Sequence, residues 1–425
     1  PPTLTSLTLG HYFNGKLVPN VLPESITTLT FGYDFNNTLD PYVLPSSITQ
    51  LTFGYSFDQP LVEGSLPYSL QELTFGYEFD RPLPPNVLPP NLQVLTFGVD
   101  FNQLIDNDVL PLSLTHLTFG ISYNCPFDER TLPSSLQTLR FGLRFNAPIR
   151  PRQLPQSLTY ISFGDYFCQP LQELPASLET LMFGPLYNLP ISPTLLSSLS
   201  SLTNISFGYN FNHTLRPGYL PESLTLLNLN DSYNSELEPG TLPSSLVKLT
   251  IGRQYNHPIK DGVLPGSLHK LKLGQTFNKT IVFPNKLQSL TLGTLQQLHY
   301  IRLLSQSMQK LTIRMVDLQD DIPKSITNAP SIREMIAWIG FGSKHLKGSH
   351  SPQRLQHLQR GLIKKMVQAL PNVHNFRINN MIGIVPLNCR LLDKDHLLCV
   401  SWSLIPQAPK VLILPLLDKK SFRSF

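Results

Sequence analysis

The 425-residue chain is poor in charged residues and in cysteine, and it has no long apolar run. Charged residues make up 14% of it, below the roughly 25% of an average soluble domain. Its 4 cysteines form no C-x-x-C pair, which argues against a zinc site. No segment approaches the about 18 consecutive apolar residues of a transmembrane helix, so no membrane span is predicted. The hydrophobic content of 41% is sufficient for a core, which argues against wholesale disorder.

Motifs of catalysis and cofactor binding are also lacking. The 11 histidines show no H-x-x-x-H or H-E-x-x-H spacing, and no G-x-S-x-G elbow or phosphate-binding glycine loop occurs. We therefore predict a non-enzymatic protein with no catalytic residues, no cofactor and no metal site. The chain opens at Pro1 without an apolar leader, and together with the few cysteines this favours a cytoplasmic location.

Proline, by contrast, is abundant, with 39 residues, and it is placed periodically. A Leu-Pro pair recurs every 22 residues from Pro23 to Pro155, and a glycine follows each proline nine residues later. The glycine column continues beyond Gly164 with steps of 20 and 24 residues and ends at Gly293. These positions define about fourteen repeats over residues 1–293, followed by a region without this period over residues 294–425.

The pattern within one repeat predicts its structure. L-x-x-L-x-F ends at the glycine and is typical of a short strand with one buried face. The proline stands just before that strand, where its missing N–H removes no ladder hydrogen bond. A unit of 22 residues cannot bury its own apolar face, so successive units must stack and share one core. The sequence therefore predicts a repeat solenoid in which each coil adds one strand to a parallel β-sheet.

Two columns follow the glycine, with Phe or Tyr three residues after it and Asn or Asp four residues after it. We predict that the aromatic column, which includes Phe79, forms the spine of the core. The Asn column is expected to form an internal, buried asparagine ladder. Glycosylation sequons at Asn36, Asn212 and Asn278 fall on this ladder, so we expect them to be unused. Cys168 takes a ladder position and is expected to be a buried thiol.

The consensus L-x-x-L-x-F-G-x-x-F-N-x-x-I/L with its preceding Leu-Pro resembles the FNIP repeat, a relative of the leucine-rich repeat (LRR). FNIP-repeat proteins are characteristic of social amoebae and of some giant viruses that infect amoebae. The resemblance covers residues 1 to about 293 and implies an LRR-like solenoid used for protein–protein interaction. Some family members carry an F-box, so one alternative is the substrate-recognition subunit of an F-box ubiquitin ligase, although this chain shows no F-box. The other alternative is a structural protein that self-assembles into a filament or coat.

Residues 294–425 lose the period but keep strand patterns of the LRR type, at 308–313, 332–338 and 373–378. A helix is expected over 351–370, and residues 342–350 are expected to form a mobile loop. A hairpin that turns at 393–395 would place Cys389 and Cys399 opposite each other, most simply as reduced thiols. With a last strand at 411–414, the region is predicted to be an α/β LRR-like cap on the solenoid.

Charge is distributed unevenly along the chain. Residues 1–130 hold 13 acidic and 3 basic side chains, a net charge of −10, and the remainder holds 15 and 30, a net charge of +15. The two ends are either ordinary solvated surfaces, or surfaces that attract different partners or associate head to tail. The cations are interspersed and no recognition motif accompanies them, so nucleic-acid binding is not expected.

Partner-binding residues are expected in columns that vary or that carry exposed aromatic rings. The column four residues before the glycine varies from coil to coil, and a row of tyrosines with acidic neighbours follows the glycine. The candidate partner-binding residues are Tyr33, Tyr55, Tyr77, Asp34, Glu78, Asp100, Glu72 and His116. Exposed aromatic rings beside carboxylates suit a basic, partly apolar protein partner. Packing of the tyrosine rings against the turn is the competing interpretation.

Overall fold

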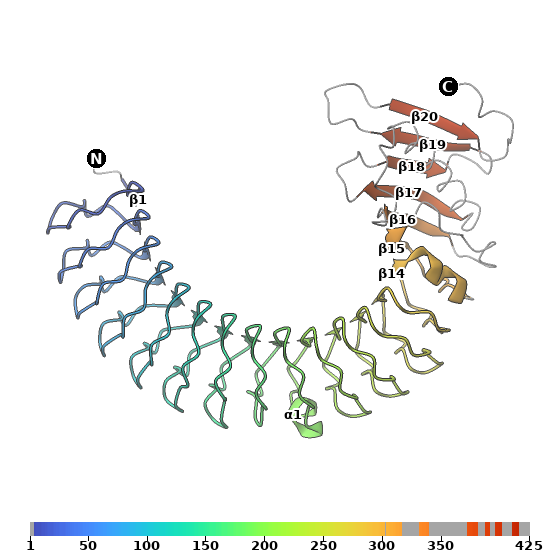
Figure 1. Cartoon of the computed structure of the whole chain (residues 1–425), viewed down its shortest axis with the longest axis horizontal. Helices are drawn as coiled ribbons and strands as arrows, with labels where there is room; N and C mark the ends of the chain where they lie inside the picture. The colour runs from blue at the N-terminus through green and yellow to red at the C-terminus, as the bar shows by residue number, and fades with distance from the viewer. Residues whose placement is uncertain are drawn as a thin grey trace, which may run out of the picture. The chain divides into compact units, whose positions relative to one another are not determined.

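The computed structural model describes residues 4–301, 303–316, 331–339, 372–380, 387–391, 396–401 and 410–415. The chain divides into two units, Pro1–His213 with Pro221–Leu224 (unit 1) and Thr214–Leu220 with Thr225–Phe425 (unit 2). In unit 1 and in the first part of unit 2, each coil is a short strand followed by a longer irregular segment with turns (Figure 1). Among the described residues, no helix is long and apolar enough to cross a membrane.

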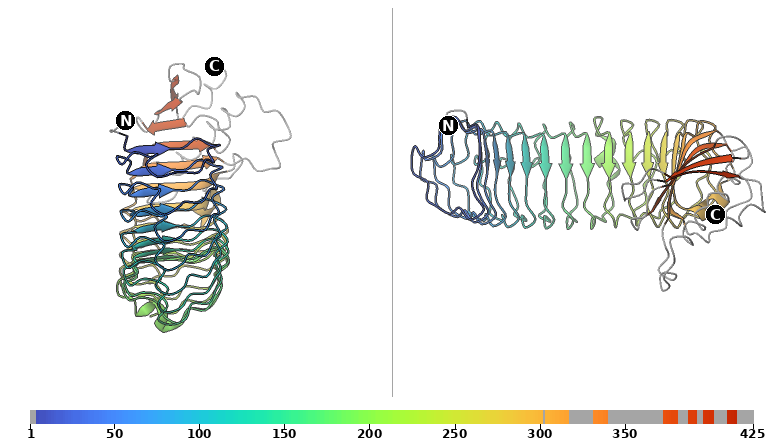
Figure 2. Two further views of the ribbon diagram at one scale, coloured as in Figure 1. Left: turned by 90° about the vertical axis from the view of Figure 1, so that its left-hand side faces the viewer. Right: turned by 90° about the horizontal axis from the view of Figure 1, so that it is seen from above.

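Unit 1 carries ten strands of three residues each, which lie side by side in one row (Figure 2). They are β1 (Ser6–Thr8), β2 (Thr28–Thr30), β3 (Gln50–Thr52), β4 (Glu72–Thr74), β5 (Val94–Thr96), β6 (His116–Thr118), β7 (Thr138–Arg140), β8 (Tyr160–Ser162), β9 (Thr180–Met182) and β10 (Asn204–Ser206). All neighbours pair in parallel, so that Leu51 lies opposite Leu29 on one side and Leu73 on the other. This pairing confirms the predicted parallel sheet and its 22-residue coil.

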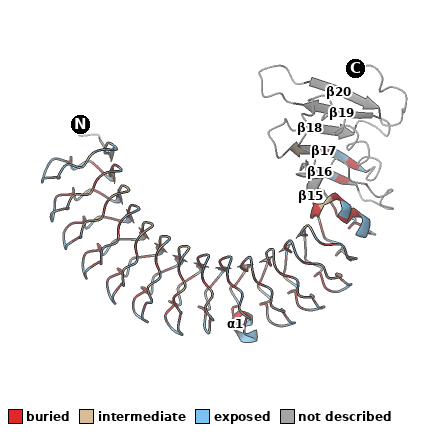
Figure 3. Cartoon of the chain, viewed as in Figure 1, coloured by how far each residue is buried: buried red, intermediate tan, exposed pale blue. Residues whose placement is uncertain are grey.

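The middle residue of each strand from β2 to β10 is buried, and its two neighbours lie on the free face of the sheet. Leu29, Leu51 and Leu73 are examples of the buried positions, which Figure 3 colours red. Behind them, Phe57, Phe79 and Phe101 form a column of stacked, fully buried rings. Ring centroids of Phe79 lie 6.0 Å from those of Phe57 and Phe101, at interplanar angles of 7° and 6°. The aromatic spine is therefore confirmed.

The glycine column lets successive coils touch backbone to backbone. A Cβ atom at Gly76 would lie 1.5 Å from the carbonyl oxygen of Gly54, and a Cβ atom at Gly98 would lie 1.5 Å from the carbonyl oxygen of Gly76. No side chain fits in that space. Asn230, which replaces glycine in this column, has a φ of 53°, in the left-handed region that Asn tolerates better than most residues.

The Asn column forms hydrogen bonds from coil to coil, but it does not lie inside the core. Oδ1 of Asn36 accepts the backbone N–H of Asp58 at 3.0 Å, and the same bond recurs along the column through Asn102, Asn124 and Asn146. Each bond needs only the backbone N–H of the adjacent coil, so the ladder can run along the partly exposed edge of the coils. The prediction of an internal ladder is therefore wrong in its location.

The burial expected for individual ladder residues is wrong as well. Asn212 and Asn278 are exposed and Asn36 is half-buried, so burial gives no argument against their modification. Cys168 is also half-buried rather than buried. Its backbone N–H donates to Oδ1 of Asn146 at 2.9 Å. The ladder bond to the preceding coil therefore involves the backbone of Cys168 and not its side chain.

The 24-residue step of the glycine column contains the helix α1 (Pro193–Ser197), which begins at a proline. Leu195 and Leu196 of this helix are buried. The additional residues therefore form a helical turn whose apolar side chains are buried, while β9 and β10 still pair in parallel.

Over its described residues, unit 2 continues the same construction with seven parallel strands and then three antiparallel ones. The parallel strands are β11 (Leu226–Asn228), β12 (Lys248–Thr250), β13 (Lys270–Lys272), β14 (Ser289–Thr294), β15 (Lys310–Val316), β16 (Ile332–Ile339) and β17 (Val373–Asn380), with a 3-10 helix η1 (Leu295–Tyr300) after β14. The antiparallel strands are β18 (Leu387–Leu391), β19 (His396–Ser401) and β20 (Lys410–Pro415).

These strands confirm the ones predicted after the repeats, including the hairpin of β18 and β19, in which Cys389 pairs with Cys399 in register. The predicted helix at 351–370 and the predicted loop at 342–350 lie outside the described residues. The division of the chain at residue 293 stays a prediction from the repeat pattern.

Candidate partner-binding surfaces

The free face of the unit 1 sheet carries two of the predicted partner-binding residues. Glu72 of β4 lies opposite Val94 of β5, and Val94 lies opposite His116 of β6. Glu72 and His116 are both exposed. The same register position holds Gln50 in β3, so four adjacent strands present an amide, a carboxylate, an aliphatic group and an imidazole on one scaffold.

The predicted tyrosine row is a stack of rings at the ends of the strands. Tyr55 lies 4.5 Å from Tyr33 and 4.5 Å from Tyr77, centroid to centroid, with interplanar angles of 8° and 15°. The ring of His11 extends the stack, 4.8 Å from Tyr33. Tyr33 and Tyr77 keep 43% and 40% of their surface exposed. The rings thus pack against each other and still present their edges to solvent, so packing and recognition are compatible here.

Backbone hydrogen bonds hold the acidic residues beside this stack. The N–H of Glu78 donates to the carbonyl oxygen of Tyr55, and that of Asp100 to the carbonyl oxygen of Tyr77, both at 2.9 Å. In the first coil of the stack, the N–H of Asp34 makes the equivalent bond to the carbonyl oxygen of His11 at 3.0 Å. Glu78 is exposed and the other two residues are half-buried, and the backbone of all three is held beside the tyrosine stack.

The carboxylates of Glu78 and Asp100 place negative charge beside the tyrosine stack. Desolvation is the largest cause that raises the pKa of Tyr55, and the neighbouring tyrosines followed by Glu78 and Asp100 raise it further. An additional negative charge is therefore disfavoured at this place. A lysine or arginine side chain would be attracted to it.

The sequence did not predict a cluster of side chains on the sheet face, two of which take the last strand position, which is threonine in β1 to β6. The guanidinium of Arg140 lies 4.1 Å from the ring centroid of Tyr160, and its Nη1 donates to the Tyr160 hydroxyl at 2.8 Å. The Tyr160 hydroxyl in turn contacts Sδ of Met182 at 3.1 Å. The signal was the large side chains of Arg140 and Met182 at this strand position, on either side of Ser162.

Unit 2 presents a cationic sheet face that the sequence did not predict either. Lys248 and Lys270 lie opposite each other in β12 and β13, and Lys272 follows on β13. Burial is the largest cause that lowers the pKa of Lys272, and the positive charge of Arg314 lowers it further. The carboxylate of Asp231 raises it. Lys310 is ion-paired with Glu334 at 2.9 Å. These cations look interspersed in the sequence, but the coil period places them on one face.

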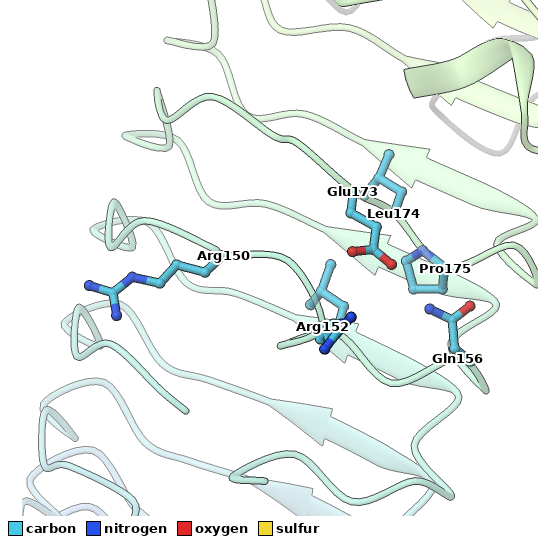
Figure 4. A pocket seen from close by; sticks show the side chains of 7 residues that line it. Arg150, Arg152, Gln156, Glu173, Leu174 and Pro175 are labelled. Carbon is cyan, nitrogen blue, oxygen red and sulfur yellow. The ribbon is translucent and has the colours of Figure 1, made fainter. Parts of the chain in front are cut away.

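A small depression between two coils of unit 1 offers no room for a ligand. It has about 160 Å³ of empty space, below the roughly 300–1,000 Å³ of typical ligand pockets. Figure 4 shows Glu173, Leu174 and Pro175 beside Gln156, with the Arg150 side chain extending away from them. Among the residues that the structure describes, no group of three or more His, Cys, Asp or Glu side chains could hold a metal ion.

Stacked coils with one buried and one free sheet face define a solenoid of the LRR type. The FNIP Repeat family model matches residues 1–34, 35–78, 79–122, 101–144, 123–166, 145–186, 199–229, 211–254 and 255–295. These matches cover more than half of the chain, which therefore belongs to the FNIP-repeat family.

Two solved structures are similar to this chain. CroV588 from a giant virus, described as a novel circular LRR protein, has a TM-score of 0.67 and 35% sequence identity over 81% of this chain and 57% of its own. The chain thus spans little more than half the length of CroV588. The internalin InlF from Listeria monocytogenes has a TM-score of 0.47 and 17% identity over 68% of this chain and 86% of its own. No curated protein sequence matches the chain.

Proposed function

We propose that the chain is a non-enzymatic scaffold that binds a protein partner along the free sheet face of unit 1. One observation carries the proposal. The first outward position of β3 to β6 differs in chemistry from coil to coil, whereas the second is threonine in all four strands and the leucine between them is always buried. A constant scaffold with variable outward positions is how solenoid proteins build specific binding surfaces.

The chemistry of the adjoining tyrosine stack indicates the kind of partner. Tyr33 and Tyr77 are exposed and Tyr55 between them is half-buried, and Glu78 and Asp100 supply negative charge beside them. Aromatic residues surrounded by charged ones are the usual composition of an interaction surface. We therefore expect a protein partner with a basic, partly apolar surface.

Affinity capture with the full chain, read by mass spectrometry, tests this function. Glu72→Lys reverses a charge on the sheet face, and Glu129→Lys makes the same change at an exposed turn away from that face. We expect a protein that is retained by the unaltered chain and by Glu129→Lys and is lost with Glu72→Lys. Equal retention by both variants would argue against the sheet face as the binding surface.

Self-association is a second candidate function, which the opposite charges of the two ends favour. Residues 1–130 have a net charge of −10, whereas the sheet face of unit 2 carries Lys248, Lys270 and Lys272. Sedimentation at low and high salt tests it, because salt screens attraction between exposed charges. Assembly at low salt that disappears at high salt is expected, and a monomer under both conditions would contradict this candidate. The role in an F-box ubiquitin ligase stays a prediction with no structural observation of its own.

A further inference from the structure

A groove of about 720 Å³ runs along unit 1 on the side where the chain enters the strands. Its lining extends from Glu24 to Leu112 and so spans five successive coils. Leu44, Leu66 and Leu88 of the Leu-Pro pairs are buried beneath it and give it an apolar floor. This groove is separate from the sheet face and from the tyrosine stack, and none of the predicted partner-binding residues lines it.

Exposed apolar side chains stand on the rims of the groove. Tyr42, Tyr68 and Leu112 are 81%, 75% and 77% exposed, which is unusual for side chains of this size. Tyr42 has a φ of 60°, and Gly64 takes the same left-handed conformation in the next coil. The Tyr42 N–H donates to the Gly64 carbonyl oxygen at 2.8 Å, so one rim is fixed by the turns themselves.

The charged residues of the groove all have the same sign. Glu24, Glu63 and Asp108 line it, and no lysine, arginine or histidine does. Among the ion pairs between described residues, none involves any of these three carboxylates. Glu24 accepts a hydrogen bond from the hydroxyl of Ser46 at 3.4 Å. The groove therefore combines an apolar floor, exposed rings and carboxylates without cationic partners within the described chain.

We propose that this groove binds an extended, cationic segment of a protein partner. Lysine or arginine side chains of the segment reach Glu63 and Asp108, and apolar residues between them cover the floor beside Tyr42 and Tyr68. The turn N–H of Tyr42 is already paired, so the segment is held by side chains rather than as an added strand. A polyproline II segment suits this mode, because its backbone needs no ladder partner and aromatic-lined grooves accept it.

The length of the groove sets the length of the segment. Four steps between coils at about 4.8 Å each give about 19 Å. A polyproline II helix rises about 3.1 Å per residue, so about six residues span the groove. The lack of cationic lining residues argues against nucleic acid and other phosphate-bearing ligands, which need positive charge.

Fluorescence anisotropy with a labelled peptide of arginine, proline and leucine, about eight residues long, tests the proposal on the full chain. The groove variant combines Glu63→Lys with Asp108→Asn, since Asn tolerates the left-handed φ of 65° at position 108. The matched control combines Glu129→Lys with Asp128→Asn, the same two changes at exposed residues outside the groove. Circular dichroism melting verifies that each variant is folded.

We expect saturable binding that weakens about 10-fold or more in the groove variant and with Tyr68→Ala, and that stays unchanged in the control. A peptide with glutamate in place of arginine should not bind. Absence of binding at millimolar peptide, or an equal affinity in the groove variant, would overturn the proposal. Loss of binding only in the control would also overturn it, because it would place the basic ligand outside the groove. The sheet-face function is tested separately by Glu72→Lys, so the two proposals fail independently.

Discussion

Phe79 lies between Phe57 and Phe101 in a column of rings that solvent does not reach. It also stacks on Phe75 of its own coil, with ring centroids 3.9 Å apart. Each ring of the column therefore contacts the coil before it, its own coil and the coil after it. The stability of the solenoid is expected to be concentrated in these contacts.

Phe79→Ala is expected to lower the free energy of unfolding by about 3–5 kcal/mol, because it removes buried contacts and leaves a cavity. Urea denaturation measures the change. Leu104→Ala, at a largely exposed position, is the control and should change stability by no more than about 0.5 kcal/mol. Near-native stability of Phe79→Ala would show that the ring column is not the centre of the core.

Tyr123 occupies the same column, and its hydroxyl is buried without a hydrogen-bond partner. Phe fills this position in several other coils, so the ring itself fits without the hydroxyl. Tyr123→Phe is expected to stabilise the protein by about 1–2 kcal/mol, because it removes an unsatisfied buried group. Thermal melting measures the gain, and a destabilised variant would mean that the hydroxyl has a partner after all.

The buried tyrosines also predict an alkaline limit of stability. Burial raises the pKa of Tyr255 to about 12 and raises those of Tyr123, Tyr187 and Tyr233 well above their usual value. Below pH 10 these groups are protonated in both states and have no effect. Between about pH 10 and 12 the unfolded chain loses protons that the folded chain keeps, so stability falls by up to about 1.4 kcal/mol per pH unit for each group.

Urea denaturation across this pH range checks the slope. Tyr255→Phe removes one titrating group and should make the fall less steep, whereas Leu104→Ala, at a largely exposed position and with no titrating group, should leave the slope unchanged. A stability that is independent of pH up to 12 would contradict the burial of these hydroxyls.

At the scale of the coil, the closest contact between neighbours is the one at the glycine column. Gly76→Ala would place a Cβ 1.5 Å from the carbonyl oxygen of Gly54, so adjacent coils must separate. We expect a loss of about 3 kcal/mol or more in the free energy of unfolding, measured by urea denaturation. Gly266→Ala is the matched control, because nothing lies within 4 Å of its added Cβ. Similar stability of the two variants would mean that coils do not touch at this column.

The coil could be predicted from the sequence because its determinants repeat. The proline, the leucine at the strand centre, the ring of Phe79 and the glycine each recur at a fixed spacing, and each has one structural role. The Asn ladder was predicted in the wrong place, inside the core. A polar side chain can find its hydrogen-bond partner at the partly exposed edge of the coils as well as in the core. Spacing alone did not distinguish the two.

The surfaces were harder to predict than the coil. Lys248, Lys270 and Lys272 share a face only because one coil follows another in register, and their distances along the sequence conceal this. The groove beside Tyr42 and Tyr68 arises from the shape of successive turns, which no single column encodes. The tyrosine stack was predicted, because its three rings recur at the coil spacing.

At the scale of the whole molecule, the repeats give one chain several surfaces of different chemistry. Unit 1 presents a variable sheet face, a tyrosine stack with carboxylates beside it and an acidic groove, and unit 2 presents a cationic sheet face. A constant coil with variable outward residues is suited to binding. Of these surfaces, we propose the sheet face of unit 1 as the one that binds the protein partner.

Carbodiimide labelling of carboxylates, compared between the free chain and the chain bound to its captured partner, tests this claim most directly. The account predicts that the reactivity of Glu72, on the sheet face, falls in the complex while that of Glu129, at an exposed turn, does not change. Protection of Glu129 with Glu72 fully reactive would contradict it.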